Sequence, residues 1–309
     1  MLEAAHAEAA DPNTETMDHA RNVVAAMSAF ALADTKSRPV SMSEAVASWA
    51  KGLDNPELLR VVPSGFYDFD DALGGGFRPG TLNLLAGRPG HGKTTMALNI
   101  IANAAERGFK SLFFSLEMPR QEVVTKMIAS RARVDISNIT IKRAKDDVLA
   151  KVAAAAGAFR ELPITIDDAA SLGVVDIAAR AAQTQTAGGL DVVIVDYLQL
   201  ITMERAKGDT KDEAVGRVTK ALKAIAKDLR IPVVALSQLN REGDTDDPQL
   251  SHLRDSGNLE QDADTVTFIR RKDKQADIMV KKNRMGRTAA FSLRFVAQHH
   301  RMDSVSYEA

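Results

Sequence analysis

The chain has 309 residues, of which 45% are hydrophobic and 26% charged, the balance of a folded globular protein with a sizeable buried core. Its formal net charge of −1 gives no global sign of nucleic-acid binding, so any such surface must be local. The absence of cysteine excludes a disulfide framework and a cysteine-ligated zinc site. No apolar run reaches the roughly 20 residues that span a bilayer, and the Ala-rich stretch 23–33 follows acidic residues rather than the basic start of a secretory signal. We therefore expect a cytoplasmic protein without a membrane partner.

Residues 1–40 are an Ala-rich, acidic extension, which we expect to be partly disordered or helical. Residues 41–59 are predicted to form a linker helix and a connector, because the apolar positions there are spaced by four, three and four residues, as on one face of a helix. These positions are Met42, Val46, Trp49 and Leu53. The apolar stripe either packs on the rest of its own chain or docks on a neighbouring subunit.

Residues 60–309 are predicted to form one α/β domain, because apolar strand-like runs alternate with helical patterns up to about residue 264. Such alternation indicates a mostly parallel sheet. The predicted strands are 81–86, 111–116, 164–166, 191–195 and 232–236, and the predicted helices are 94–106, one that opens at Pro119, 174–186 and 212–230. After residue 264 the pattern changes to antiparallel strands at 265–271, 277–282, 289–296 and 301–306.

A glycine-rich loop between the first strand and its helix matches the pattern G-x-x-x-x-G-K-[ST] in full, in the strand-to-helix context that confirms a phosphate-binding loop. In such a loop, glycine backbone and helix N–H groups surround the phosphates. Lys93 should reach the β- and γ-phosphates, and the Thr94 hydroxyl should bind Mg²⁺. The predicted nucleotide-binding residues are Gly87, Arg88, Pro89, Gly90, His91, Gly92, Lys93, Thr94 and Thr95.

Three polar residues stand at the ends of later strands, at the sheet edge where open α/β sheets bind ligands. Asp196 is expected to help hold Mg²⁺; strands that end in an aspartate are common, and the assignment gains its strength from the phosphate loop. Glu117 can polarise the attacking water, although a helix-capping acid ahead of Pro119 is the alternative. Gln238 can sense the γ-phosphate, although it can also be a simple loop residue. Together with the loop, these strand ends predict an ATP- and Mg²⁺-dependent nucleotide hydrolase.

Further segments resemble the C-terminal motor domain of the DnaB-type replicative helicases, within the RecA-like P-loop group, over residues 60–306. The segments that carry the resemblance are PSGF at 63–66, GGGFRPG at 74–80, FSLEM at 114–118, DYLQL at 196–200, LSQLNR at 236–241, LRDSGNLEQDAD at 253–264 and KNRMG at 282–286. The segment at 253–264 is the most specific of them.

The resemblance implies a homo-hexameric ring that hydrolyses ATP between subunits, moves along single-stranded DNA and unwinds forked DNA in the 5′–3′ direction. By this likeness Glu117 is the water-activating base, Gln238 the γ-phosphate sensor, and Lys282 with Arg284 the pair inserted into the neighbour's site. A guanidinium supplied in trans is worth about 10³–10⁵ in rate. The alternative for Lys282 and Arg284 is a solvated basic hairpin.

The resemblance also implies DNA contacts by Arg254, Asp255 and Gly257. Arg254 can neutralise a phosphate, and a glycine N–H can approach one closely; the alternative is that Arg254 pairs with a nearby acid such as Asp255. By the same likeness, the DNA-contacting loops follow the strands that end at Asp196 and Gln238. Because these loops have no aromatic residues, we expect the protein to follow the DNA backbone rather than to stack on bases.

Three other classes share part of this pattern. A RadA- or RecA-type recombination ATPase has the same phosphate loop and a Lys-Asn-Arg segment, but the absence of cysteine and the segments around Glu117 and Asp255 favour the helicase. A helicase loader or regulatory ring would keep the ATP site without unwinding, and a degenerate ring would bind ATP without turnover.

The likeness departs from the family at the front of the chain. Members of the family carry a globular N-terminal domain of well over a hundred residues, whereas only about forty residues precede the predicted linker helix. A compact helicase of a phage or mobile element would fit this departure, and so would a family member that assembles chiefly through the 41–53 helix. Contacts to a primase or a helicase loader are left open.

Overall fold

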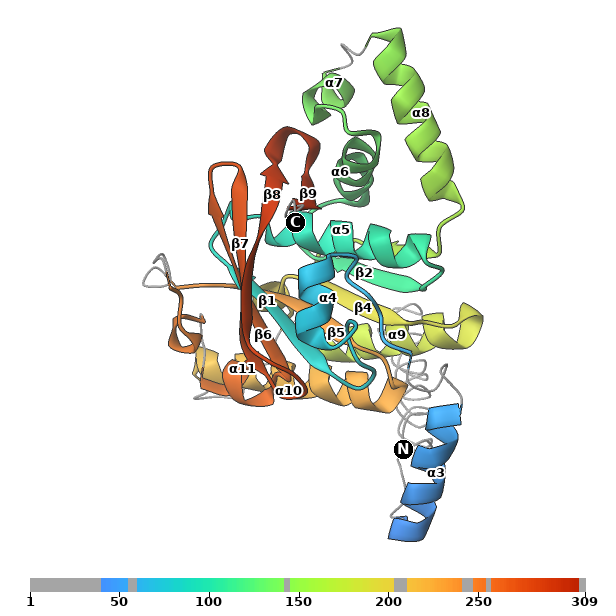
Figure 1. Ribbon diagram of the computed structural model, residues 1–309, viewed down its shortest axis with the longest axis vertical. Coiled ribbons are helices and arrows are strands. Elements are labelled where there is room, and N and C mark those ends of the chain that lie inside the picture. The colour runs from blue at the N-terminus through green and yellow to red at the C-terminus, as the bar shows by residue number, and fades with distance from the viewer. Residues whose placement is uncertain are drawn as a thin grey trace, which may run out of the picture.

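The computed structural model describes residues 40–54, 60–141, 145–202, 210–240, 247–253 and 257–305. Within these residues the chain forms a nine-stranded sheet in the order β3-β2-β4-β5-β1-β6-β7-β8-β9 (Figure 1). The parallel strands are β1 (Leu82–Gly87), β2 (Ser111–Ser115), β3 (Ile164–Asp167), β4 (Val192–Asp196), β5 (Val233–Gln238) and β6 (Thr265–Lys272). The antiparallel strands are β7 (Gln275–Asn283), β8 (Ala289–Val296) and β9 (Arg301–Ser304). The predicted mostly parallel sheet with antiparallel C-terminal strands is confirmed.

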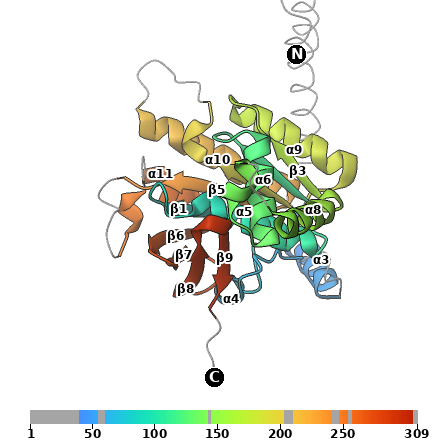
Figure 2. The same cartoon turned by 90° about the horizontal axis from the view of Figure 1, so that it is seen from above.

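Helices cover both faces of the parallel part. The described α-helices are α3 (Met42–Asp54), α4 (Tyr67–Leu73), α5 (Lys93–Glu106), α6 (Arg120–Ala132), α7 (Ile136–Thr140), α8 (Asp146–Arg160), α9 (Val174–Gly188), α10 (Lys211–Leu229) and α11 (Gly257–Asp262). Side chains of α9, α10 and α11 pack in one apolar core, and those of α4, α5 and α6 pack in the other. Figure 2 shows α9 and α10 on one side of β1 and β5, with α5 on the opposite side. Of the described helices, none is both long and apolar enough to cross a bilayer.

The buried strands explain how the sheet creates a site. β1, β2 and β4 are buried along their whole length, as expected for apolar strands covered on two faces. Since they run parallel to one another and to β5, their carboxyl ends meet at one edge of the sheet. Polar residues that follow these strands are therefore brought together there.

The helix predicted from the apolar spacing at the front of the domain is present as α3. Its start is capped reciprocally, because the Ser41 N–H donates to the Glu44 carboxylate (2.9 Å) and the Glu44 N–H donates to Ser41 Oγ (3.2 Å). Three apolar side chains of its stripe are more than half exposed: Met42, Val46 and Trp49. The fourth, Leu53, lies outside the described side chains. Figure 1 shows α3 at the margin of the molecule, so the exposed stripe does not pack on the described part of its own chain.

Candidate nucleotide site

The phosphate loop lies between the end of β1 and the start of α5. β1 ends at Gly87 and α5 begins at Lys93, so the first N–H groups of α5 face the loop and favour an anion there. Gly92 has φ +93°, and a Cβ at this position would lie 2.8 Å from the Phe295 ring and 2.7 Å from Met302 Cε. A side chain is thus excluded both by the backbone conformation and by close packing of the C-terminal strands against the loop.

The next two residues carry the chemistry expected of the motif. Lys93 is buried and its ammonium donates to the carbonyl oxygens of Gly87 (2.9 Å) and Arg88 (3.3 Å). Burial lowers the pKa of Lys93, while the charges of Asp196 and Glu117 act in the opposite direction. The Lys93 ammonium is therefore positioned over the loop by neutral acceptors, which a phosphate can replace with a charge-assisted bond.

A hydroxyl and a carboxylate fit a divalent cation beside this lysine. Thr94 Oγ1 donates to Asp196 Oδ2 at 2.7 Å. Burial raises the pKa of Asp196 to about 6, and the charge of Glu117 adds to the shift. Among the described residues, no group of three or more His, Cys, Asp or Glu side chains could hold a metal alone. The two oxygens therefore suit Mg²⁺, which keeps waters and substrate phosphates in its coordination shell rather than an all-protein cage.

The three predicted strand-end residues converge on the same cavity. In the sheet register, Ser115 pairs with Asp196 and Gly87 pairs with Gln238, and Glu117 follows β2 two residues beyond Ser115. A cavity of about 490 Å³ is lined by residues of the loop and by all three strand ends, including Lys93, Thr94, Thr95, Glu117, Asp196 and Gln238. The structure therefore brings together at one cavity most of the residues to which the sequence assigns nucleotide, metal and water-activating roles, whereas Gly87, Arg88 and His91 of the loop are not part of its lining.

Further contacts hold these elements in register. The Arg88 guanidinium donates to the carbonyl oxygens of Leu239 (3.3 Å) and Asn240 (3.2 Å), which ties the phosphate loop to the end of β5. The Gln238 N–H donates weakly to Gln199 Oε1 (3.4 Å). The side chain of Arg88 thus stabilises the conformation of the phosphate loop by bonding the backbone that follows β5.

The cavity also has a wall that could not be predicted from the sequence motifs. The same cavity is lined by Arg271 near the end of β6, by Phe295 of β8 and by His300 in the turn before β9. The Arg271 guanidinium lies over the Phe295 ring, 4.4 Å from its centroid, and burial lowers the pKa of His300. The wall follows from the sheet order, since β6 pairs with β1. A prediction of that pairing would have placed the β6–β7 turn beside the phosphate loop.

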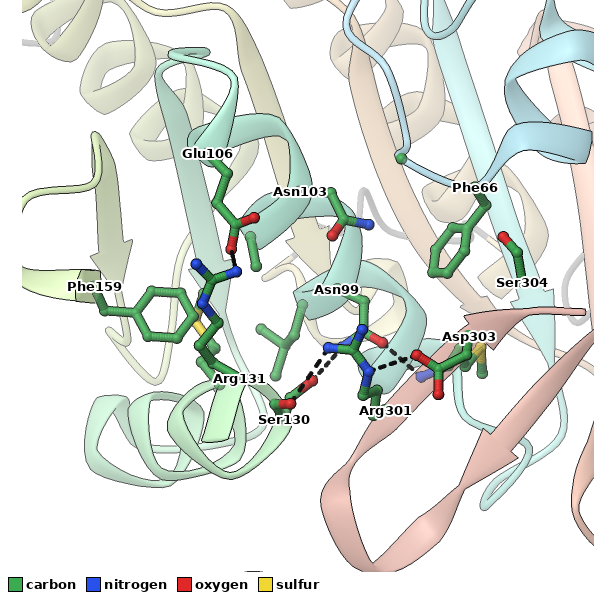
Figure 3. Close-up of a pocket in the computed structure, with 15 residues that line it drawn as sticks. Phe66, Asn99, Asn103, Glu106, Ser130, Arg131, Phe159, Arg301, Asp303 and Ser304 are labelled. Carbon is green, nitrogen blue, oxygen red and sulfur yellow. Dashed lines mark hydrogen bonds and ion pairs between the residues drawn. The ribbon is translucent and has the colours of Figure 1, made fainter. Parts of the chain in front are cut away.

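Figure 3 shows a second cavity, of about 270 Å³, lined by α5, α6 and β9. Asn99 of α5 accepts from the Met302 N–H (2.7 Å) and donates to the His300 carbonyl (3.2 Å). The cationic groups of the lining are ion-paired: Arg131 with Glu106 and Arg301 with Asp303. This cavity therefore lies at the packing interface between α5 and β9. The contacts of Asn99 there hold His300 beside the nucleotide cavity.

Lys282 and Arg284 lie away from the nucleotide cavity formed around the phosphate loop. Asn283, between them, pairs with Thr265 at the start of β6, whereas Gly87 pairs with Ile269 of the same strand. Four residues of strand separate the two positions, a distance of about 13 Å. Lys282 and Arg284 therefore stand near the opposite edge of the sheet from their own phosphate loop.

Both cations are held there by the end of α11. The Lys282 ammonium donates to the Glu260 carbonyl, and Arg284 Nη2 donates to the Gln261 carbonyl (2.5 Å). These carbonyls belong to the last turn of a helix, where no intrahelical donor is available. Burial lowers the pKa of Lys282, and the charge of Arg284 lowers it further.

Of the predicted DNA contacts, Gly257 is the first residue of α11, whereas Arg254 and Asp255 lie outside the described residues.

Comparison with known proteins agrees with this geometry. Residues 61–304 match the family model of the DnaB-like helicase C terminal domain. The replicative DNA helicase DnaB of Haemophilus influenzae is 39% identical over 271 residues, which cover 82% of this chain and 57% of that protein. DnaB of Geobacillus stearothermophilus is 33% identical over 268 residues, covering 80% and 59%. The chain thus spans somewhat more than half the length of these curated relatives.

Solved structures give the same result. A DnaB-like replicative helicase, solved in a study of its interactions with primase, has a TM-score of 0.78 at 25% identity, covering 96% of this chain and 81% of that one. An isolated ATPase domain superposes with a TM-score of 0.81 at 28% identity, covering 87% and 100%. A KaiC-like protein of Pyrococcus horikoshii, 20% identical with a TM-score of 0.56, shares the fold alone. The predicted RecA-like fold and the family resemblance are confirmed, and the chain belongs to the family of the DnaB-like helicase C-terminal domain.

Proposed function

We propose that this protein is an ATP-dependent replicative DNA helicase that works as a homo-hexameric ring on single-stranded DNA. The observation that carries the proposal is the division of one catalytic set between two edges of the sheet. The phosphate loop, Thr94, Asp196, Glu117 and Gln238 surround one cavity, while Lys282 and Arg284 stand about 13 Å along the sheet from the loop. A closed ring brings the second group of one subunit to the cavity of the next.

The proposed mechanism assigns each group a position around the γ-phosphate. Lys93 leaves its carbonyl acceptors and binds the β- and γ-phosphates. Thr94 and Asp196 would hold Mg²⁺, which neutralises phosphate charge when bound. Glu117 accepts the proton of the attacking water, and Gln238 contacts the γ-phosphate through its amide. Lys282 and Arg284 of the neighbouring copy meet the charge that develops on the transferred phosphoryl group.

DNA binding is part of the same proposal. We assign backbone contacts to Arg254, Asp255 and Gly257, at the segment that leads into α11. Because α11 also holds Lys282 and Arg284 through its last carbonyls, a DNA contact at its start would be felt at the trans-acting pair. We place this activity in the cytoplasm, with unwinding in the 5′–3′ direction.

The test of the function is unwinding of a forked DNA in both polarities, run beside mass measurement of the protein with ATP and Mg²⁺. A hexamer that unwinds the 5′-tailed fork is the expected result. ATP hydrolysis by a ring that unwinds neither fork would point instead to a loader or regulatory ring, and strand exchange with a homologous duplex would point to a recombinase. Pull-down with a primase and with a loader of the same replication system tests whether this chain shares the primase contact of its structural relative.

We propose in addition that α3 is a linker helix that docks on the next subunit. A groove of about 530 Å³ between α9 and α10 is lined by the apolar side chains Val174, Val175, Ala214, Val218 and Ala221 and also by the charged Asp176 and Arg217. An apolar stripe with an acid (Glu44) and a base (Lys51) on the same helix complements such a groove in both polarity and charge.

Trp49→Ala is expected to lower the fraction of hexamer at a given protein concentration, since interface aromatics contribute about 2 kcal/mol or more when buried. Tyr67→Ala, which removes a still more exposed aromatic from α4, is the control and should leave assembly unchanged. Equal assembly of the Trp49 variant and the wild type would remove α3 from the interface.

A further inference from the structure

Asp264 is a buried carboxylate that follows α11 and is 7% exposed. One of its oxygens, Oδ2, is fixed to two elements of the fold. It accepts from the Leu82 N–H of β1 (2.7 Å) and from the Lys223 ammonium of α10 (2.6 Å). The carboxylate therefore has a fixed orientation, with Lys223 providing its main counter-charge.

The other side of the same residue holds Arg284. The Arg284 N–H donates to the Asp264 carbonyl oxygen (2.9 Å), and Arg284 Nη1 lies 3.7 Å from Asp264 Oδ1. The Arg284 side chain is 49% exposed. Thus Asp264 anchors the backbone of Arg284 and, together with the Gln261 carbonyl that accepts from Arg284 Nη2 (2.5 Å), sets the direction of the guanidinium, while the side chain stays half exposed.

The geometry of this ion pair favours exchange of partners. At 3.7 Å the two groups attract each other without a short charge-assisted hydrogen bond. Lys223 already bonds the carboxylate directly, so its positive charge cancels part of the field that Asp264 exerts on Arg284. A phosphate that carries more charge and offers bidentate acceptors can therefore displace Asp264 from Arg284.

We propose that Asp264 is the positioning residue of the trans-acting Arg284. It keeps the guanidinium extended at the subunit edge. The γ-phosphate of the nucleotide bound by the neighbouring copy then replaces Asp264 as the partner of Arg284. This inference rests on the proposed function, because it requires Arg284 to act in trans. It predicts that a defect at Asp264 appears in the neighbour's site and not in the site of the chain that carries the substitution.

Mixed rings test this directly. Arg284→Ala subunits have a complete cavity but no arginine to give, and Glu117→Gln subunits give the arginine but lack the base. A mixture of the two should regain ATP hydrolysis at sites where a Glu117→Gln subunit faces an Arg284→Ala cavity. This reference mixture is then compared with two others, in which Asp264→Asn is added either to the Glu117→Gln subunit or to the Arg284→Ala subunit.

The expected result is asymmetric. Asp264→Asn on the arginine-giving Glu117→Gln subunit should lower the recovered kcat by about tenfold to a hundredfold, with the KM for ATP little changed because the lost interaction belongs to the transition state. The same substitution on the Arg284→Ala subunit should leave the recovered rate at the reference value. If Asp264 had a merely structural role, the substitution would lower the recovered rate equally in both mixtures, or only in the mixture in which the cavity-bearing Arg284→Ala subunit carries it.

Each other outcome has a definite meaning. Equal rates in all three mixtures, or a loss that follows the Arg284→Ala subunit, would overturn the positioning role. A reference mixture without any recovered hydrolysis removes the trans mechanism, and with it this inference. Mass measurement checks that each mixture forms rings. If Asp264→Asn alone does not assemble, because it leaves Lys223 without its carboxylate, the double change Lys223→Met and Asp264→Asn removes both charges, and the same asymmetry is expected.

Discussion

The phosphate-loop cavity and the edge that carries Lys282 and Arg284 differ in how their charged groups are held. In the cavity, Lys93, Thr94 and Asp196 are bonded within their own chain, and Lys93 and Asp196 are also buried. At the other edge, Arg284 is half exposed and its guanidinium is held by a helix-end carbonyl and a 3.7 Å ion pair. The groups that we propose to bind the nucleotide are thus held by short bonds inside the cavity, whereas the group that we propose to act at the transition state is held more loosely and can change partners.

Removal of the Arg284 side chain is expected to have the largest effect and tests whether the two regions differ in function. In homogeneous Arg284→Ala rings we expect kcat for ATP hydrolysis to fall by about 10³–10⁵, with nucleotide affinity nearly unchanged, because the cavity of each subunit stays complete. The measurements are steady-state hydrolysis and titration with a fluorescent nucleotide.

A matched control for Arg284 is Arg287, which is more exposed and pairs with Asp71 on the surface. Arg287→Ala should leave hydrolysis close to the wild-type rate, since exposed ion pairs contribute about 0–1 kcal/mol. Similar losses in both variants would mean that the basic hairpin acts through general charge rather than through a trans-acting arginine.

Glu117→Gln tests the cavity side of the comparison. The substitution keeps the size of the side chain and removes the proton acceptor, so we expect turnover to fall by about 10²–10⁴ while ATP binding is retained. Glu122 lines the same cavity but is ion-paired with Lys126 at 2.7 Å, and Glu122→Gln is the control, with turnover expected to stay near normal. Normal turnover in the Glu117 variant would move the base to another residue.

A pair of glycine substitutions sharpens the role of the C-terminal strands in the cavity. Gly90 and Gly92 both have positive φ (+80° and +93°), so alanine is strained at either position. A Cβ at Gly90 meets no atom within 4 Å, whereas a Cβ at Gly92 meets Phe295 and Met302 below 3 Å. Gly92→Ala should therefore lower the free energy of unfolding by about 1–3 kcal/mol more than Gly90→Ala, measured by urea denaturation without nucleotide. Equal losses would mean that β8 and β9 do not press on the loop.

The sequence predicted where the residues of the first region meet, because the signals for that region are local. A strand, a glycine loop and a helix are adjacent in the chain, and parallel strands necessarily bring Glu117, Asp196 and Gln238 to one edge. The wall made by Arg271, Phe295 and His300 was missed because it depends on which strand pairs with β1, and no local pattern encodes that choice. The helices α4, α7 and α8 were also missed: the first and second are short, and α8 buries only Ala155 among its described side chains, so its apolar pattern is weak.

The second region was recognised only through family resemblance, and its supporting contacts were not foreseen. Lys282 and Arg284 lie in a basic hairpin that looks like any solvated surface in the sequence. The contacts that distinguish it, from the Glu260 and Gln261 carbonyls and from Asp264, join segments about twenty residues apart through the turn between β6 and β7. Periodicity reports which face of an element is buried, but not which carbonyl a cation meets.

The smallest effect is expected where the second region would meet DNA. Each phosphate contact adds about −0.7 to the slope of log affinity against log salt for single strands. Arg254→Ala should therefore reduce the magnitude of that slope by about 0.7 per engaged subunit and weaken binding equally for different base sequences, because phosphate contacts do not read bases. The measurement is anisotropy of a labelled oligonucleotide at several salt concentrations with a non-hydrolysable nucleotide. Lys227→Ala, on the C-terminal turn of α10, is the control. An unchanged slope in the Arg254 variant would separate the segment before α11 from the DNA path, and α11 would then hold Lys282 and Arg284 without receiving a signal from DNA.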